Sequence, residues 1–154
     1  MTRIATLVVA GLFLASCGGS PTFSVSDATV DDSYACPVNA HNAAYDLHGT
    51  ISAHNGTGSS VLITSVSAVM TLTAVSGTWL QKVGDRYDAG SVAFTPSSVS
   101  AGATASLQVT IPSSCTHGQT ASGTNYGEYT VTFKIVSGAG PFTITSKNKH
   151  RILA

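Results

Sequence analysis

The stretch YDLHGTISAH, residues 45–54, decides the fold class of this chain. Its apolar and small residues alternate with polar ones: Tyr45, Leu47, Gly49, Ile51 and Ala53 form one set, and Asp46, His48, Thr50, Ser52 and His54 form the other. A period of two places successive side chains on opposite faces of a β-strand. We therefore predict a strand with one face in a hydrophobic core and the other in water.

Similar patterns recur farther along the chain. Residues 105–111 place apolar side chains on one face, and we expect Pro112 to end that strand. Residues 129–135 alternate most regularly of all. The sequence SGAG at 137–140 then predicts a hairpin turn into a strand over residues 142–146.

The middle of the chain is less regular. The β-branched run 61–75 changes parity near residues 64–66, which predicts a bulge or two strands meeting at a bend. Residues 78–83 indicate a weaker strand, and residues 84–90, GDRYDAG, indicate a turn. The whole pattern gives seven or eight strands and no helix after the first residues, so we predict an all-β antiparallel sandwich.

Two segments resemble immunoglobulin-like domains. NYGEYTV at 125–131 is similar to the tyrosine corner that precedes the sixth strand of that family, and FTPSSVSAGATASLQV at 94–109 resembles bacterial immunoglobulin-like modules. The resemblance covers roughly residues 45–152 and implies that the Tyr129 hydroxyl bonds to the backbone across a corner. Trp79 departs from the family, because it falls too late to be the usual tryptophan of the third strand.

The first residues read as an export signal. Arg3 precedes an apolar run of about eleven residues, which is too short for a transmembrane helix of roughly 20. LASC at 14–17 resembles the lipobox of bacterial lipoproteins, which implies cleavage before Cys17 and attachment of diacylglycerol to its sulfur. An ordinary cleaved signal is the alternative. Gly18, in place of an acidic residue, implies delivery to an outer membrane or the cell surface.

These features divide the chain into three parts. We assign residues 1–16 to a lipoprotein signal helix, 17–33 to the lipidated cysteine and a flexible tether, and 34–154 to the immunoglobulin-like sandwich. Within the tether, residues 22–25 are a candidate first strand. Cys36 and Cys115 remain, and an exported pair in an oxidising compartment predicts a disulfide. Two free buried thiols are the alternative. In an immunoglobulin-like sandwich the second and fifth strands are neighbours, which would bring the two cysteines together.

Charge excludes one class of partner. Seven Lys and Arg balance seven Asp and Glu, and only 9% of residues are charged. A nucleic-acid-binding domain carries a basic excess, so we predict no nucleic acid partner. The expected partners are the membrane, through the lipid, and an envelope protein or wall polymer.

No motif for catalysis or for a cofactor occurs in the sequence. The simplest interpretation of Asp85 and Asp88 is that they form a turn. We therefore predict that the protein is not an enzyme and needs no cofactor. His41 and His117 each lie within five residues of a bridge cysteine, so they are weak candidates for a zinc or copper site. Asp27, Asp31 and Asp32 could form a calcium cluster, but they lack the spacing and the glycine of a known calcium-binding loop. We interpret them as solvated linker residues.

The sequence KNKHR at 147–151 carries cations on alternate positions of a strand. We interpret Lys147, Lys149 and Arg151 as protection of an exposed sheet edge. The alternative is a basic stripe for an anionic polymer or lipid headgroups.

The function that follows is a lipid-anchored envelope protein with a non-catalytic adhesion or scaffolding role. The alternative is an extracytoplasmic binding module for copper, zinc or carbohydrate. A carbohydrate site would need an exposed aromatic platform, for which the sequence offers Trp79, Tyr87 and Tyr126.

Overall fold

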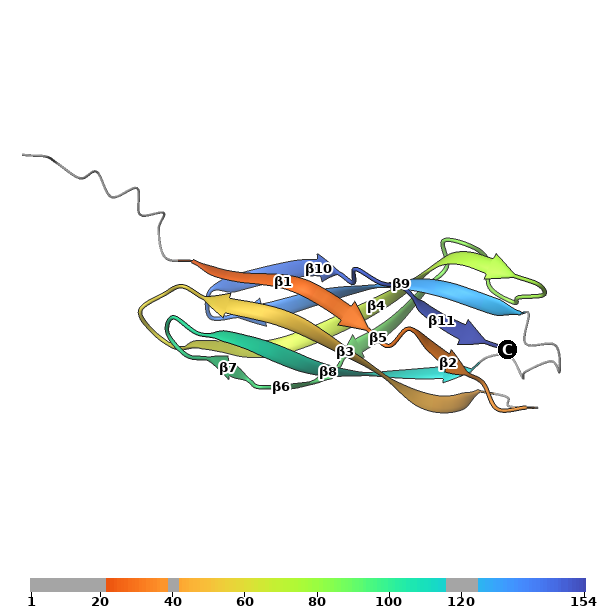
Figure 1. Ribbon diagram of the computed structural model, residues 1–154, viewed down its shortest axis with the longest axis horizontal. Coiled ribbons are helices and arrows are strands. Elements are labelled where there is room, and N and C mark those ends of the chain that lie inside the picture. The colour runs from red at the N-terminus through yellow and green to blue at the C-terminus, as the bar shows by residue number, and fades with distance from the viewer. Residues whose placement is uncertain (1–21, 39–41, 116–124) are drawn as a thin grey trace, which may run out of the picture.

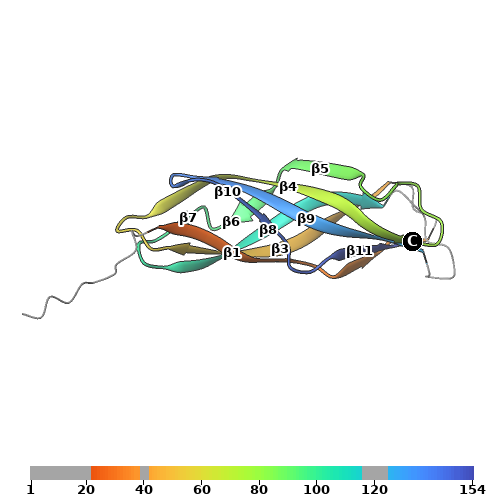
Figure 2. The same cartoon turned by 90° about the horizontal axis from the view of Figure 1, so that it is seen from above.

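The computed structural model describes residues 22–38, 42–115 and 125–154, and within these ranges all the regular structure is β-strand. Two sheets pack face to face as an elongated sandwich (Figures 1 and 2). The four-stranded sheet has the order β1 (Phe23–Val30), β3 (Ala43–Asn55), β8 (Thr104–Cys115), β6 (Ala93–Thr95). The seven-stranded sheet runs β2 (Ser33–Ala35), β11 (His150–Leu153), β9 (Tyr126–Ser137), β4 (Val61–Ser76), β5 (Arg86–Ser91), with β10 (Gly140–Thr145) beside β9 and β7 (Ser98–Val99) beside β4.

The strand order is that of an immunoglobulin-like domain, in which the first, second, fifth and fourth strands form one sheet. Three of the family's strands are interrupted here. The first is β1 plus β2, because the chain leaves the four-stranded sheet after Val30 and pairs in parallel with β11 from Ser33. The fourth is β6 plus β7, and the last is β10 plus β11. Eleven segments thus fill eight strand positions, which confirms the predicted sandwich.

The alternation that predicted β3 is the pattern of burial in the structure. Tyr45, Leu47 and Ile51 face the core, and β3 pairs with β8 without interruption from Ala43 to His54. The parity change in β4 is a bulge, because the register with β9 shifts between Ile63 and Ser65. One continuous strand therefore keeps its apolar side chains in the core on both sides of the irregularity.

The first strand lies in the segment that we assigned to the tether. Ala28 and Val30 are buried in the core, and β1 pairs with β3 around an irregularity at Asp27, whose φ is 54°. The candidate strand over residues 22–25 is therefore real but longer, and its continuation to Val30 was missed because polar residues interrupt the apolar pattern. The described domain therefore begins near Phe23 and not at residue 34.

Three further expectations were wrong. Residues 78–83 are a loop and not a weak strand, and Arg86–Ser91 in the expected turn form the edge strand β5. An edge strand needs only backbone pairing on one side, so its mostly exposed side chains show no apolar period. Pro112 does not end β8, which continues to Cys115.

A disulfide joins Cys36 and Cys115, as predicted. Its route differs from the expected one, because Cys36 follows β2 in the seven-stranded sheet while Cys115 ends β8 in the other. The bridge therefore ties the two sheets together. Both cysteines are buried, at 2% and 0% exposure.

The sandwich has two distinct ends. The N-terminal end contains Phe23 and the hairpin after Ser137, and the far end contains Cys115, residues 77–85 and Ala154 (Figure 1). Within the described residues, no helix has the length and hydropathy needed to cross a bilayer.

Candidate functional site

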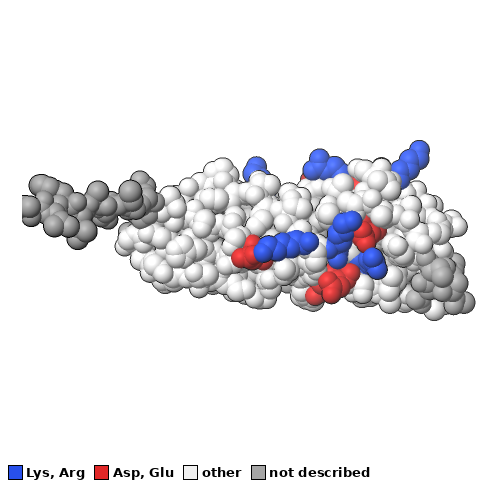
Figure 3. Space-filling model, turned by 45° about the horizontal axis from the view of Figure 1, so that its top comes forward, with Lys and Arg blue, Asp and Glu red and all other residues white. Residues whose placement is uncertain are grey.

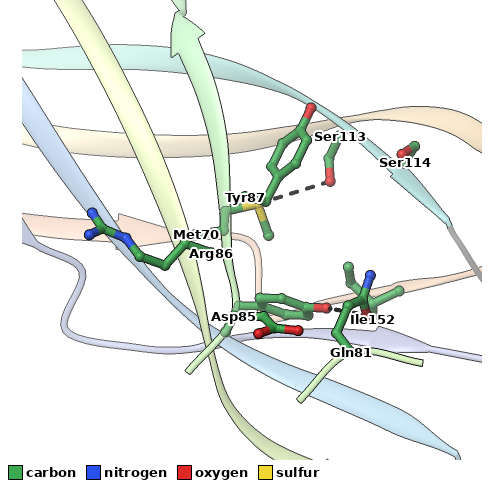
Figure 4. Close-up of a pocket in the computed structure, with 9 residues that line it drawn as sticks. Met70, Gln81, Asp85, Arg86, Tyr87, Ser113, Ser114 and Ile152 are labelled. Carbon is green, nitrogen blue, oxygen red and sulfur yellow. Dashed lines mark hydrogen bonds between the residues drawn. The ribbon is translucent and has the colours of Figure 1, made fainter. Parts of the chain in front are cut away.

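A cleft of about 140 Å³ opens at the far end, between the two sheets. Five elements contribute to it, which are β4, β5, β8, β9 and β11, together with the loop before β5 (Figure 4). The residues that line it are Met70, Gln81, Asp85, Arg86, Tyr87, Ser113, Ser114, Tyr129 and Ile152.

The cleft exists because the inward side chains of β8 become small toward its end. Ile111 fills the space between the sheets, but the next inward residue is Ser113. Opposite Ser113 lie Met70, Tyr129 and Ile152, which are 1%, 6% and 6% exposed. A serine leaves part of the space open that a larger apolar side chain would occupy.

The walls carry neutral hydrogen-bonding groups. The Ser113 hydroxyl faces the Met70 sulfur at 4.0 Å (Figure 4), and the Tyr129 hydroxyl donates to Gln81 Oε1 at 3.3 Å. Burial raises the pKa of Tyr129, so its hydroxyl stays protonated at neutral pH. The expected tyrosine corner is therefore absent in its usual form, because Tyr129 bonds to a side chain in the loop and not to backbone.

Tyr87 lines one side of the cleft and also contacts the edge of the four-stranded sheet at Pro112. Its hydroxyl donates to the Pro112 carbonyl at 3.2 Å. A residue's nitrogen and carbonyl point to the same side of a strand, so the Pro112 nitrogen also points away from β3. On that side, β6 pairs with β8 only as far as Thr110, so no described strand lies beside Pro112. The N–H group that proline lacks would therefore have had no strand partner.

The three aromatic residues proposed as a carbohydrate platform do not form one. A Cβ on Gly127 would lie 2.6 Å from the Trp79 ring, so that ring rests on the β9 backbone and is partly buried. Tyr126 has the Arg151 guanidinium 5.1 Å from its ring centroid. Only Tyr87, which is 42% exposed, lines the cleft.

The metal hypothesis finds no support in the described residues. Within ranges 22–38, 42–115 and 125–154, no three His, Cys, Asp or Glu side chains are placed to hold a metal ion. His41 and His117 lie outside the described residues. His48 and His54 lie on the exposed face of β3, where His48 Nδ1 is 3.3 Å from Asp31 Oδ2 and His54 Nδ1 is 3.0 Å from Thr104 Oγ1.

His150 is the polar residue that sequence reasoning missed. It is fully buried, with Nε2 3.0 Å from the Tyr45 hydroxyl and Nδ1 2.7 Å from the Asp31 carbonyl. Burial lowers the pKa of His150 and raises the pKa of Tyr45 to about 12. The signal was present, because the alternation that turns Lys149 and Arg151 outward turns His150 inward.

The acids near the start have separate partners, but Asp27 lies within β1 and not in a linker as expected. Asp27 pairs with Lys147, and Asp31 accepts a hydrogen bond from the His48 backbone at 3.0 Å. Asp32 accepts a bond of 2.8 Å from Asn148. No calcium cluster forms from them.

Asp85 is a turn former, as predicted, whereas Asp88 lies within the edge strand β5. Asp85 accepts a hydrogen bond from the backbone of Lys82 at 2.9 Å, and Asp88 accepts one from the backbone of Gly90 at 2.8 Å. The Asp85 carboxylate thus stabilises its turn, and the Asp88 carboxylate stabilises the irregularity in β5 where the register with β4 shifts.

The C-terminal cations are not edge protection. Strand β11 lies between β2 and β9, so it is not an edge. Lys149 and Arg151 instead hold Glu128, at 2.6 and 3.0 Å, and lower the pKa of its carboxyl. Figure 3 shows Lys and Arg next to Asp and Glu on this face, whereas the part nearest the N-terminal end carries almost none. A basic stripe is therefore largely neutralised.

Comparisons with known proteins give little beyond the fold. No protein-family model and no curated protein matches the sequence. Among solved structures, the chain is similar to the ASH / PapD-like domain of human CEP192 (PapD-like domain 7), with 11% identity and a TM-score of 0.37. The alignment covers 97% of this chain and 97% of that chain. Because the two superpose only loosely, the fold assignment here rests on the strand order.

Proposed function

We propose that this is an exported protein, anchored by lipid on Cys17, whose sandwich has a non-catalytic adhesion or scaffolding role in the cell envelope. Its location would be an outer membrane or the cell surface. The lipobox-like sequence at 14–17 supports the anchor.

The disulfide is the observation that carries the proposal. It takes two of the three cysteines in the sequence and leaves Cys17, which follows the apolar run directly. Disulfides form in exported proteins and are rare in the cytosol. The use of the three cysteines therefore fits one bridge and one lipid.

The geometry gives such an anchor a consequence. Five residues, 18–22, separate Cys17 from Phe23, so these two residues can lie at most about 22 Å apart. The N-terminal end would then lie near the lipid. Strand β3 has 13 residues, which at about 3.3 Å each measure roughly 40 Å, so the cleft would lie well away from the membrane.

Metabolic labelling with radioactive palmitate tests the anchor. Wild-type protein should take up the label, and a Cys17→Ala variant should not. Ser20→Ala, outside the lipobox-like sequence, is the matched control and should label like the wild type. Absence of label from the wild type, or its retention in Cys17→Ala, contradicts the proposal.

A carbohydrate-binding module is the second candidate function. The position of Tyr87 at the cleft favours it over the metal alternative. Copper or zinc binding that disappears in a His41→Ala/His117→Ala double variant would reverse this preference.

A further inference from the structure

We propose that the cleft at the far end binds one uncharged pyranose ring of an envelope glycan. This inference rests on the second candidate function, a carbohydrate-binding module, and it names the ligand class and the residues that would contact it. Size, chemistry, charge and position each favour it.

The size of the cleft fits one six-membered ring. A cavity of about 150 Å³ accommodates benzene in a protein core. The volume of 140 Å³ here is similar, and the cleft is open on one side, so the substituents of a ring can extend into water. A longer glycan would leave its remaining units outside.

The lining is apolar at the back and hydrogen-bonding at the sides. The back consists of Met70 and Ile152, which offer a surface for the C–H groups of a sugar. The Ser113 hydroxyl lies on one side and Gln81 lies on the other (Figure 4), where the Tyr129 hydroxyl donates to Gln81. A ring that carries hydroxyls around its rim and C–H groups on its face matches this division.

Ser113, Gln81 and Tyr129 are neutral, and the charged group beside them is a carboxylate, which favours an uncharged ring over an anionic one. The Arg86 guanidinium points away from Ser113 and Ser114 in Figure 4, so Arg86 supplies no cation between the walls. Asp85 is the charged group beside Gln81 and Tyr129, and its carboxylate can accept hydrogen bonds from sugar hydroxyls. An anionic ligand would approach this carboxylate without a cation to compensate.

An apolar side chain of a protein partner is the main competitor. The nearby loop exposes Leu80 and Val83, at 70% and 60%, which would suit such a partner. An apolar group, however, would make no hydrogen bond to the Ser113 or Tyr129 hydroxyl, whereas a sugar hydroxyl can. We therefore assign the cleft to the sugar, and the protein partner becomes an outcome of the test.

Saturation-transfer NMR on the full mature protein tests the proposal. The probes are methyl β-D-glucopyranoside, methyl β-D-galactopyranoside and N-acetylglucosamine, with glucuronate as the anionic comparison and benzyl alcohol as the apolar ring. Transfer to ring protons of at least one neutral sugar is the expected result. Tyr87→Ala should weaken its binding about tenfold, the effect of losing roughly 1.4 kcal/mol from an aromatic contact.

Tyr126→Ala is the matched control, because it removes a tyrosine outside the cleft and should leave the affinity unchanged. Ser113→Ala tests the hydroxyl wall and should weaken sugar binding while leaving benzyl alcohol unaffected. No transfer from any neutral sugar, glucuronate binding as tight as theirs, or equal loss in the two tyrosine variants overturns the proposal. Binding of benzyl alcohol alone assigns the cleft to an apolar side chain. None of these results affects the palmitate labelling of Cys17, so failure here is distinct from failure of the anchor.

Discussion

The hydroxyl of Tyr45 lies 3.0 Å from Nε2 of the fully buried His150, across the interior of the sandwich. Tyr45 belongs to β3 in one sheet, and His150 begins β11 in the other. Because His150 Nδ1 donates to the Asp31 carbonyl, Nε2 of the neutral ring accepts from Tyr45. Tyr34 stacks on Tyr45 with ring centroids 3.9 Å apart. A polar chain thus joins both sheets to the turn between β1 and β2.

Replacing Tyr45 with phenylalanine should destabilise the fold. The change keeps the ring but leaves Nε2 of His150 without its donor, and an unsatisfied buried group costs about 1 to 3 kcal/mol. Tyr34→Phe is the control, because it preserves the stacked ring and should cost less than about 0.5 kcal/mol. Urea unfolding monitored by circular dichroism gives both free energies. Equal effects of the two variants would contradict the role assigned to the Tyr45 hydroxyl.

Stability should fall as the pH drops below about 6.5, the ordinary pKa of histidine. Burial lowers the pKa of His150 in the folded protein. Between the folded and unfolded pKa values, His150 is therefore protonated in the unfolded chain but neutral in the folded one, and protonation favours unfolding. The stabilisation is complete above 6.5 and is lost as the pH falls toward the folded pKa. Carboxyls of Asp27 and Glu128, whose pKa values are lowered from 3.8 and 4.5, act only at more acidic pH.

Urea unfolding between pH 8 and pH 5 measures this slope. His150→Gln should flatten it, whereas His54→Gln, on the exposed face of β3, should leave it as in the wild type. An unchanged slope in His150→Gln would show that another group is responsible.

The burial of His150 shows what alternation can and cannot reveal. The same period that correctly predicted the core faces of β3, β8 and β9 also applies to β11, yet β11 has only four residues. The composition of KNKHR, a histidine among basic residues, indicates an exposed segment. The alternation of a β-strand, in contrast, places His150 on the inward face when Lys149 and Arg151 point outward. The period was the better guide, because side-chain direction in a strand follows from backbone geometry.

Gly127→Ala should displace Trp79. The new Cβ would lie 2.6 Å from Cε2 and Cζ2 of the indole ring, which is closer than atoms approach, so the ring must move. Trp79 is the only tryptophan of the sequence, so its fluorescence reports on this site alone. We expect a red-shifted emission and a loss of about 1 to 3 kcal/mol, as for an overpacked contact.

Gly138→Ala is the matched control for this change. Its Cβ would have the Leu62 carbonyl oxygen as nearest neighbour, at 3.9 Å, which is an ordinary contact. Emission and stability should stay near the wild-type values. A Gly127→Ala protein with unchanged fluorescence would mean that Trp79 does not rest on β9.

Loss of the disulfide should be the most destabilising of these changes. The bridge joins residues 79 apart, and the chain-entropy model gives about 4 to 5 kcal/mol for a loop of that length. A Cys36→Ala/Cys115→Ala variant and the reduced wild type should lose similar stability in urea. A loss below about 1 kcal/mol would show that the unfolded chain is already compact in this region.

The cleft could not have been predicted from the sequence, although the sandwich could. Strong apolar alternation determines which strands face the core, but β5 has mostly exposed side chains and pairs through backbone alone. The cleft then depends on one small inward residue, Ser113, opposite side chains from other strands. Ser113 follows Pro112, which we expected to end the strand, so its inward direction was not foreseen. Tyr87 was named as a sugar-binding candidate, but its partners across the cleft were not.

The intact mass of the protein extracted from membranes tests the central claim most directly. The account predicts a mature chain that begins at Cys17 and carries diacylglycerol on that sulfur, with Cys36 and Cys115 oxidised. A chain with an unmodified Cys17, or one whose first residue lies elsewhere, would contradict the anchor and the orientation inferred for the cleft.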